Sequence, residues 1–296
     1  MGFDIYQMVT DMIVERMKQG EIPWDMPYKI RYGECAIKQN GKPYSWINQF
    51  LLGKPGKYFT FKYAQSLGFN IRKGAKARTA VFWKLLDGDK HYNEKGEVVY
   101  QDRIPYLRYY KVFHESDVEG FVREDTTEID AERNAESVLS ADDIVNGYLG
   151  TPRGPRFIVE DTIPCYSPML DYIKCPQKAQ FKSISHYYKT LFHEMVHSTG
   201  HKDRLNRDLG TDFFERNLHS YSKEELVAEI GSSYLANIAD LPDKSIENQV
   251  AYLQHWMKIL QGNPKWIVWA SSRAEMACKY ILNEKEDDDS SEQAES

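Results

Sequence analysis

Apolar residues recur at helical spacing near both ends of the chain. Between Asp4 and Gly20 they fall every three or four positions, which predicts an amphipathic helix with Asp4 as its cap and Gly20 at its end. The same spacing predicts helices over residues 140–150, 185–200, 245–261 and 263–282, and one that begins at Ser222 with Glu225 in a capping box. Most of the predicted helices therefore lie in the second half.

Shorter segments rich in β-branched and aromatic residues predict strands between these helices. They cover residues 79–84, 98–100, 106–113, 156–160 and 171–175, and a strand that runs into a short helix is expected over 59–67. Residues 164–168, which begin and end with Pro, are expected to form the turn between the last two strands. The mixture of elements in both halves predicts two α+β domains.

An acidic stretch separates the two halves of the chain. Residues 115–136 hold nine Asp and Glu against two Arg, which favours a linker. We place the first domain at 1–120, the linker at 121–138 and the second domain at 139–283. The acidic tail over 284–296 is expected to be disordered.

Composition is that of a soluble globular protein, with 42% hydrophobic and 28% charged residues. The chain contains no run of about 18 apolar residues, so no membrane span is predicted. The start of the chain lacks the basic and apolar segments of a signal peptide. The four Cys are scattered without a C-x-x-C pair, which is typical of reduced thiols. We therefore expect a cytoplasmic protein with no membrane contact.

Charge is divided unevenly between the halves. Residues 1–112 carry 19 Lys and Arg against 11 Asp and Glu, whereas residues 113–296 carry 19 against 33. A basic half joined to an acidic half indicates that the first half meets nucleic acid. The alternative is a chance distribution of solvated surface charge.

The strongest chemical signal is the H-E-x-x-H pattern over residues 193–197. On a helix His193 and His197 lie one turn apart on the same face, so that both imidazoles can bind one metal ion. Two imidazoles and a carboxylate suit Zn²⁺, or Mn²⁺ with the same ligands. Glu194 is then placed to act as a general base on the water that the ion activates. The bland alternative is a helix with two His on its polar face.

A third ligand is needed, and three residues are candidates for it. His201 follows Gly200 and reaches the ion only if the chain turns sharply there. Glu225 is assigned to the capping box of the next helix. Glu229 lies one turn deeper among apolar residues, where a carboxylate is costly unless it is paired or bound to metal. We therefore predict Glu229, with Glu225 as the second choice and His201 as the third.

These motifs in combination resemble the ArdC-type antirestriction proteins of mobile plasmids. The resemblance rests on residues 193–201, on the Arg-Leu-Asn-Arg run at 204–207 and on residues 225–231, and it extends over nearly the whole chain. It implies a zincin-like metallopeptidase domain in the second half and a domain that binds single-stranded DNA in the first. In zincins the edge strand of a small sheet pairs with extended substrate.

The basic half is also rich in aromatic residues, as single-stranded DNA binders are. More than half of these aromatics are expected to form core instead. The turn around Gly74 carries a cluster of basic residues that suits phosphate contact. The residues predicted to contact DNA are Arg72, Lys73, Lys76, Arg78, Tyr44, Trp46, Asn48 and Trp83.

Three hypotheses about function follow. By resemblance, the chain is an antirestriction protein that binds single-stranded DNA, carries a metal-dependent peptidase site and protects incoming DNA from host restriction. Its protein substrate would then be a host restriction enzyme or another protein. The second hypothesis is a protein that coats the DNA strand, with a structural or regulatory metal. The third is a DNA-bound protease that acts on DNA–protein crosslinks.

Overall fold

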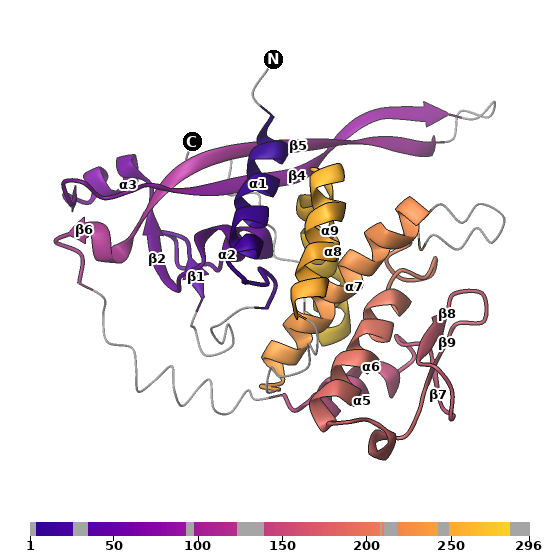
Figure 1. Ribbon diagram of the computed structural model, residues 1–296. Helices are drawn as coiled ribbons and strands as arrows, with labels where there is room; N and C mark the ends of the chain where they lie inside the picture. Colours follow the sequence, from indigo (N-terminus) through magenta and orange to yellow (C-terminus); the bar gives the residue numbers. More distant parts are fainter. Residues whose placement is uncertain are drawn as a thin grey trace.

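The computed structural model describes residues 4–25, 35–92, 98–122, 139–207, 209, 218–241 and 249–284 (Figure 1). Strands predominate in its first half and helices in its second, and the α+β fold predicted for the chain is confirmed. In the described part of the chain, no helix is both long enough and apolar enough to span a bilayer. The predicted linker and acidic tail lie almost entirely outside the described residues.

A four-stranded sheet of order β1-β2-β5-β4 forms the centre of the N-terminal half. Its strands are β1 (Ala36–Ile37), β2 (Gly56–Phe59), β4 (Arg78–Tyr92) and β5 (Val98–His114). The last two pair in antiparallel fashion as a hairpin that extends well beyond the rest of the sheet (Figure 1). The prediction of separate strands over 98–100 and 106–113 was wrong. The polar residues between them stay in the ladder because β4 pairs with them.

Short elements flank this sheet. They are α1 (Ile5–Lys18), α2 (Trp46–Leu52), α3 (Phe61–Ser66), β3 (Asn70–Ile71), the 3-10 turn η2 (Glu115–Asp117) and β6 (Val118–Glu119). The carboxylate of Asp4 accepts from two amides of the first turn of α1, and the hydroxyl of Thr60 caps α3. Both helices therefore begin where their capping residues predicted.

The C-terminal half combines a small sheet with five helices among the described residues. The elements are α5 (Ala141–Leu149), β7 (Arg156–Val159), β8 (Cys165–Ser167), β9 (Tyr172–Cys175), η3 (Lys178–Gln180), α6 (Ile184–Ser198), α7 (Leu218–Ile238), α8 (Gln249–Gly262) and α9 (Trp266–Leu282). The strand order is β7-β9-β8. The segment expected to be a turn at 164–168 is therefore mostly strand β8, which lies at the edge of this sheet.

Both halves contribute to the largest hydrophobic cluster among the described residues. One cluster of buried side chains includes Val9 and Ile13 of α1, Phe50 of α2, and Leu191 and Met195 of α6. Helix α1 packs on α8, and the buried hydroxyl of Thr10 donates to the carbonyl oxygen of Pro264 at 2.7 Å. The predicted domains are therefore joined by burial of apolar surface, the dominant favourable term in folding.

Asn48 of α2 holds β4 by a pair of hydrogen bonds. Its amide nitrogen donates to the carbonyl oxygen of Val81, and its side-chain oxygen accepts from the amide of Val81, both at 2.7 Å. The side chain is 2% exposed. Its role is thus to satisfy two backbone groups that are otherwise buried without partners.

Replacing Asn48 by Ala should lower the free energy of unfolding by about 2–4 kcal/mol, because it strands two buried polar groups. Chemical denaturation of Asn48→Ala beside wild type measures this loss. Gln65→Ala, on the exposed surface of α3, serves as the control and should have almost no effect. Equal stability of Asn48→Ala and wild type would show that the paired hydrogen bonds are not a stabilising contact.

Candidate metal centre

Helix α6 carries the two motif histidines on the side that faces α7. It begins after Ser183, whose hydroxyl accepts from the amide of His186, and its apolar side buries Leu191 and Met195 completely. His193 and His197 lie at the edge of this apolar side and are only partly exposed. The helical spacing therefore places both imidazoles at the packed interface between α6 and α7.

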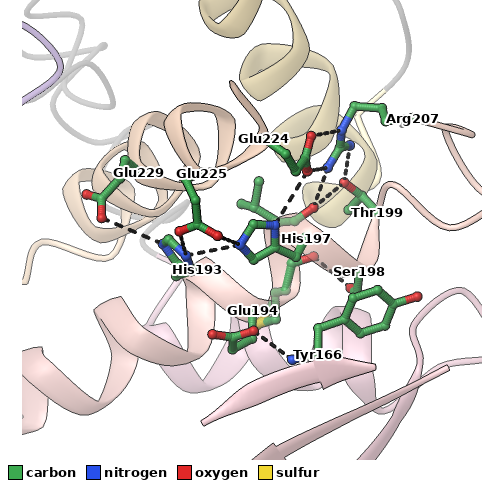
Figure 2. Close-up of polar contacts among 12 residues, drawn as sticks. Tyr166, His193, Glu194, His197, Ser198, Thr199, Arg207, Glu224, Glu225 and Glu229 are labelled. Atoms are coloured by element: carbon green, nitrogen blue, oxygen red, sulfur yellow. Dashed lines mark hydrogen bonds and ion pairs between the residues drawn. The ribbon is translucent and has the colours of Figure 1, made fainter. Parts of the chain in front are cut away.

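Three ligand atoms meet at this interface. The two Nε2 atoms of His193 and His197 are 3.1 Å apart, and each lies 3.3 Å from a different oxygen of the Glu225 carboxylate, His193 from Oε2 and His197 from Oε1 (Figure 2). A tetrahedral ion with ligand bonds of about 2.0–2.1 Å has ligand atoms roughly 3.4 Å from one another. Among the described residues, one ligand atom from each of these three side chains lies within 4.8 Å of the other two, and the separations of 3.1 and 3.3 Å are close to those that such an ion requires.

The structure replaces Glu229 with Glu225 as the third member of this group. The argument against Glu225 was that it caps a helix beginning at Ser222, but α7 begins four residues earlier at Leu218. Glu225 therefore lies inside the helix, one turn before Glu229 and on the same face. The carboxylate of Glu229 lies beyond the group, with Oε1 4.0 Å from Nδ1 of His193.

His201 is also outside the group. The chain turns after Gly200, as a third histidine ligand requires, but the turn brings His201 to Asp203. Nδ1 of His201 lies 3.5 Å from that carboxylate and accepts from the amide of the same residue at 3.3 Å.

A second carboxylate faces His197 from behind. Oε1 of Glu224 lies 3.5 Å from Nδ1 of His197, and Glu224 is 2% exposed. Arg207, 4% exposed, pairs with Glu224 at 2.6 Å and also donates to the carbonyl oxygen of Val196. Burial raises the pKa of Glu224, but the charge of Arg207, hydrogen bonds to His197 and Arg207 and the charge of His197 together outweigh burial and lower it. A carboxylate behind a ligating histidine is a common way of orienting the ring and selecting its tautomer.

Without metal, the group holds a proton on His197. Burial lowers the pKa of His197, but hydrogen bonds to Glu224 and Glu225 outweigh it and raise the pKa to about 10. Burial likewise raises the pKa of Glu225, while hydrogen bonds to the two histidines bring it far below its usual range. The site thus pairs a cationic imidazole with carboxylates, as buried charge requires.

The side chain of Glu194 extends from α6 towards the small sheet. Its Oε2 accepts from the amide of Tyr166 in β8 at 2.7 Å (Figure 2). Tyr166 is opposite Ile173 of β9, and because its amide donates to Glu194, that amide points to the outer edge of the strand. Behind it, the phenol donates to Asp171, which also pairs with Arg204. The carboxylate of Glu194 therefore lies between the metal group and the edge of β8.

The residues predicted to contact DNA divide into buried and exposed sets. Tyr44 and Trp46 are each 5% exposed and Asn48 is 2% exposed. Trp46 stacks on Tyr234 with ring centroids 3.8 Å apart. These three side chains belong to the interior, because large aromatic rings fill cores and Asn48 is occupied by β4. Their prediction as DNA contacts is corrected accordingly.

The basic residues near Gly74 are more accessible. Arg72, Lys73 and Lys76 are exposed on the turn before β4. Arg78 is partly buried and donates to the carbonyl oxygen of Leu52. Trp83 is partly buried and packs against the large core cluster. The side chains of Arg72, Lys73 and Lys76 are therefore accessible to solvent, whereas Arg78 and Trp83 are engaged within the fold.

One face of the hairpin groups aromatic and basic side chains that were not among the predicted DNA contacts. Phe82 is opposite Arg108 and Lys84 is opposite Tyr106, so that the four alternate across β4 and β5. The rings of Phe82 and Tyr106 are 6.3 Å apart, and the charges of Lys84 and Arg108 lie over them at 5.6 and 5.0 Å. We call these four residues the hairpin face. The alternation of side chains between the two faces of each strand is the sequence signal that predicts the hairpin face.

Comparison with known proteins agrees with this geometry. Residues 3–113 match the N-terminal domain of anti-restriction factor ArdC, and residues 153–273 match a zincin-like metallopeptidase domain. The Mn(II)-bound crystal structure of antirestriction ArdC protein from the R388 plasmid superposes with a TM-score of 0.67 at 30% identity, over 95% of this chain and 98% of that one. The chain belongs to the ArdC antirestriction family. The predicted resemblance is confirmed.

A second solved structure and two longer proteins also resemble this chain. The metal-free form of the R388 protein matches with a TM-score of 0.63, over 96% of this chain and 100% of that one. A DNA primase TraC of Escherichia coli is 28% identical over 94% of this chain, which spans only 20% of that protein. A second TraC is 29% identical, and the chain spans 27% of it. ArdC-like sequence thus also occurs as part of longer proteins.

The choice between the two glutamates can be tested by metal stoichiometry. Glu225→Gln should lose stoichiometric Mn²⁺ or Zn²⁺, because it removes one of three ligand atoms. Glu229→Gln should still bind one ion, but more weakly. Equilibrium dialysis followed by metal analysis measures both. A full complement of metal in Glu225→Gln together with none in Glu229→Gln would restore the original assignment.

Metal affinity should also depend on pH in a specific way. Because the pKa of His197 is about 10 in the metal-free protein, an ion that binds at lower pH must displace that proton. Affinity should then rise about tenfold per unit between roughly pH 7 and 9. A histidine of ordinary pKa gives an almost level profile there. Calorimetry in buffers of different ionisation enthalpy counts the proton released, and zero protons at about pH 8 contradicts the paired arrangement.

Proposed function

We propose that this chain is a metal-dependent peptidase that binds single-stranded DNA and protects entering DNA from restriction. The observation that carries the proposal is the position of Glu194. It lies next in sequence to a ligand histidine and touches the edge strand of the adjacent sheet. A general base beside both a metal group and a strand edge suits hydrolysis of an extended peptide.

The donor set suits a divalent ion. His193, His197 and Glu225 would hold it, as two imidazoles and one carboxylate suit Zn²⁺ and also Mn²⁺. A bound ion of this kind supplies a Lewis acid that lowers the pKa of water. The Mn(II) form of the R388 protein supports manganese as a candidate beside zinc.

Glu194 and β8 would act on the peptide. The carboxylate of Glu194 would act as the general base, while its Oε2 accepts from the amide of Tyr166 in β8. An extended peptide that adds to the edge of β8 would place its backbone beside that carboxylate. Asp171 and Arg204 brace the phenol of Tyr166 and thereby keep β8 in position.

The hairpin face would bind the DNA strand. Phe82 and Tyr106 offer ring surfaces on which bases stack, and Lys84 and Arg108 lie close enough to hold the neighbouring phosphates. Arg72, Lys73 and Lys76 extend the basic surface at the base of the hairpin. Bases in a duplex are already stacked and hide their faces, so this surface favours single strands.

The role of Glu194 decides between an enzyme and a protein that coats DNA. Glu194→Gln should keep the metal and the DNA affinity but lose peptidase activity, because a general base typically contributes about 10²–10⁴-fold. Protection of an entering plasmid against restriction should fall with it. Glu160→Gln, which changes an exposed carboxylate directly after β7 that pairs with Lys174, serves as the control. Full protection by Glu194→Gln would favour the non-catalytic coating protein.

Stacking on the hairpin face can be measured with labelled oligonucleotides. Phe82→Ala should weaken single-strand binding by about 1–3 kcal/mol, the usual contribution of a stacked base. Arg108→Ala should weaken binding and reduce its dependence on salt. Phe61→Ala, an exposed phenylalanine on α3, is the matched control. Unchanged binding by Phe82→Ala, or a preference for duplex, would exclude the hairpin face as the site.

A further inference from the structure

Trp24, a buried side chain of the N-terminal half, is linked to the metal group through Tyr252 of α8. Trp24 follows α1, is 1% exposed, and packs edge-on against Tyr252 and Trp256 of α8. Its indole nitrogen donates to the phenol oxygen of Tyr252 at 3.0 Å. The phenol of Tyr252 donates to Oε2 of Glu229, also at 3.0 Å.

The far oxygen of the same carboxylate faces a metal-group histidine. Oε1 of Glu229 lies 4.0 Å from Nδ1 of His193, on the side of the ring opposite the Nε2 atom that meets Glu225. Trp24, Tyr252, Glu229 and His193 therefore form a continuous series across three helices and both family domains. Trp24 belongs to the region matched by the ArdC N-terminal domain, and the other three to the zincin-like region.

We propose that Trp24 and Tyr252 are positioning residues for His193, and that through them the N-terminal half contributes to metal affinity. The proposal rests on the assignment of His193, His197 and Glu225 as ligands. Glu229, which the sequence suggested as a ligand, is here the residue that orients one.

The direction of the hydrogen bonds supports this role. An indole nitrogen can only donate, so the phenol oxygen of Tyr252 must accept from Trp24 and give its own proton to Glu229. Burial, with the charge of Glu229, raises the pKa of Tyr252 well above its ordinary value, so the phenol keeps that proton. A carboxylate that lies on the Nδ1 side of His193, here at 4.0 Å, favours the imidazole tautomer with its proton on Nδ1 and leaves the lone pair of Nε2 for the ion.

Residues that orient a ligating histidine typically change metal affinity by roughly 10–100-fold when they are removed. We therefore expect Tyr252→Phe, which deletes only the donor hydroxyl, to weaken Mn²⁺ binding by about that factor. Trp24→Phe should weaken it less, because Tyr252 still touches Glu229. One Mn²⁺ per chain should still bind in both variants, since the three ligands remain.

The test is a titration of the full-length metal-free protein with Mn²⁺. Binding is detected by calorimetry or by the loss of the electron paramagnetic resonance signal of free Mn²⁺. Thr10→Val is the matched control. It also removes a buried hydrogen bond between the two halves, from Thr10 to the carbonyl oxygen of Pro264, but that bond has no link to Glu229. Thermal unfolding of each metal-free variant reports on general loosening.

A double-mutant cycle separates positioning from loss of stability. If Tyr252 acts through Glu229, then adding Tyr252→Phe to Glu229→Gln should weaken Mn²⁺ binding no further, because contacting residues in one network are not additive. Full additivity, equal weakening by Thr10→Val, or wild-type affinity in Tyr252→Phe would each overturn the proposal. Since metal binding is measured and not hydrolysis, this result stands apart from the peptidase test.

Discussion

The packing of α7 against α6 is the contact on which the metal centre depends. It brings Glu224, Glu225 and Glu229 of one helix to His193 and His197 of the other (Figure 2). Buried carboxylates are costly unless they are paired. In the metal-free protein the pairing comes from Arg207 and from a proton on His197. An ion at the three ligand atoms would replace that proton, so the site is organised for a cation before one arrives.

Each helix position on α7 has a different task. Glu225 faces both Nε2 atoms, whereas Glu224 and Glu229 lie behind the rings at the two Nδ1 atoms. Arg207, in the zincin-like region, donates to Glu224. Tyr252 donates to Glu229 and accepts in turn from Trp24, which belongs to the N-terminal half. With α1 packed on α8 and a common core, the two family domains form one structural unit around the site.

The H-E-x-x-H spacing was enough to predict which imidazoles meet, because helical geometry alone decides it. The third member of the group could not be found in the same way. The Ser222 and Glu225 pattern imitates a helix start, but α7 begins at Leu218 and places both residues in its interior. Helix ends depend on tertiary packing as well as on capping residues, so a local signal misled the choice between two glutamates one turn apart.

In the N-terminal half, too, features decided by neighbouring residues were predicted and features decided by tertiary packing were not. Caps at Asp4 and Thr60 act within a few residues and were predicted. Whether an aromatic residue lies inside or outside depends on distant packing, and Trp46 is buried against Tyr234, nearly two hundred positions away in the sequence. Period-two alternation places Phe82 and Lys84 on one face of β4, but only the register of β4 and β5 places Phe82 opposite Arg108.

The most direct measurement is a crystal structure of the Mn²⁺-loaded protein with an anomalous difference map at the manganese edge. The account predicts one peak within about 2.0–2.3 Å of both Nε2 atoms and of a Glu225 oxygen, with Glu229 at Nδ1 of His193 and outside the coordination sphere. A peak bonded to Glu229, with Glu225 turned away, would contradict it.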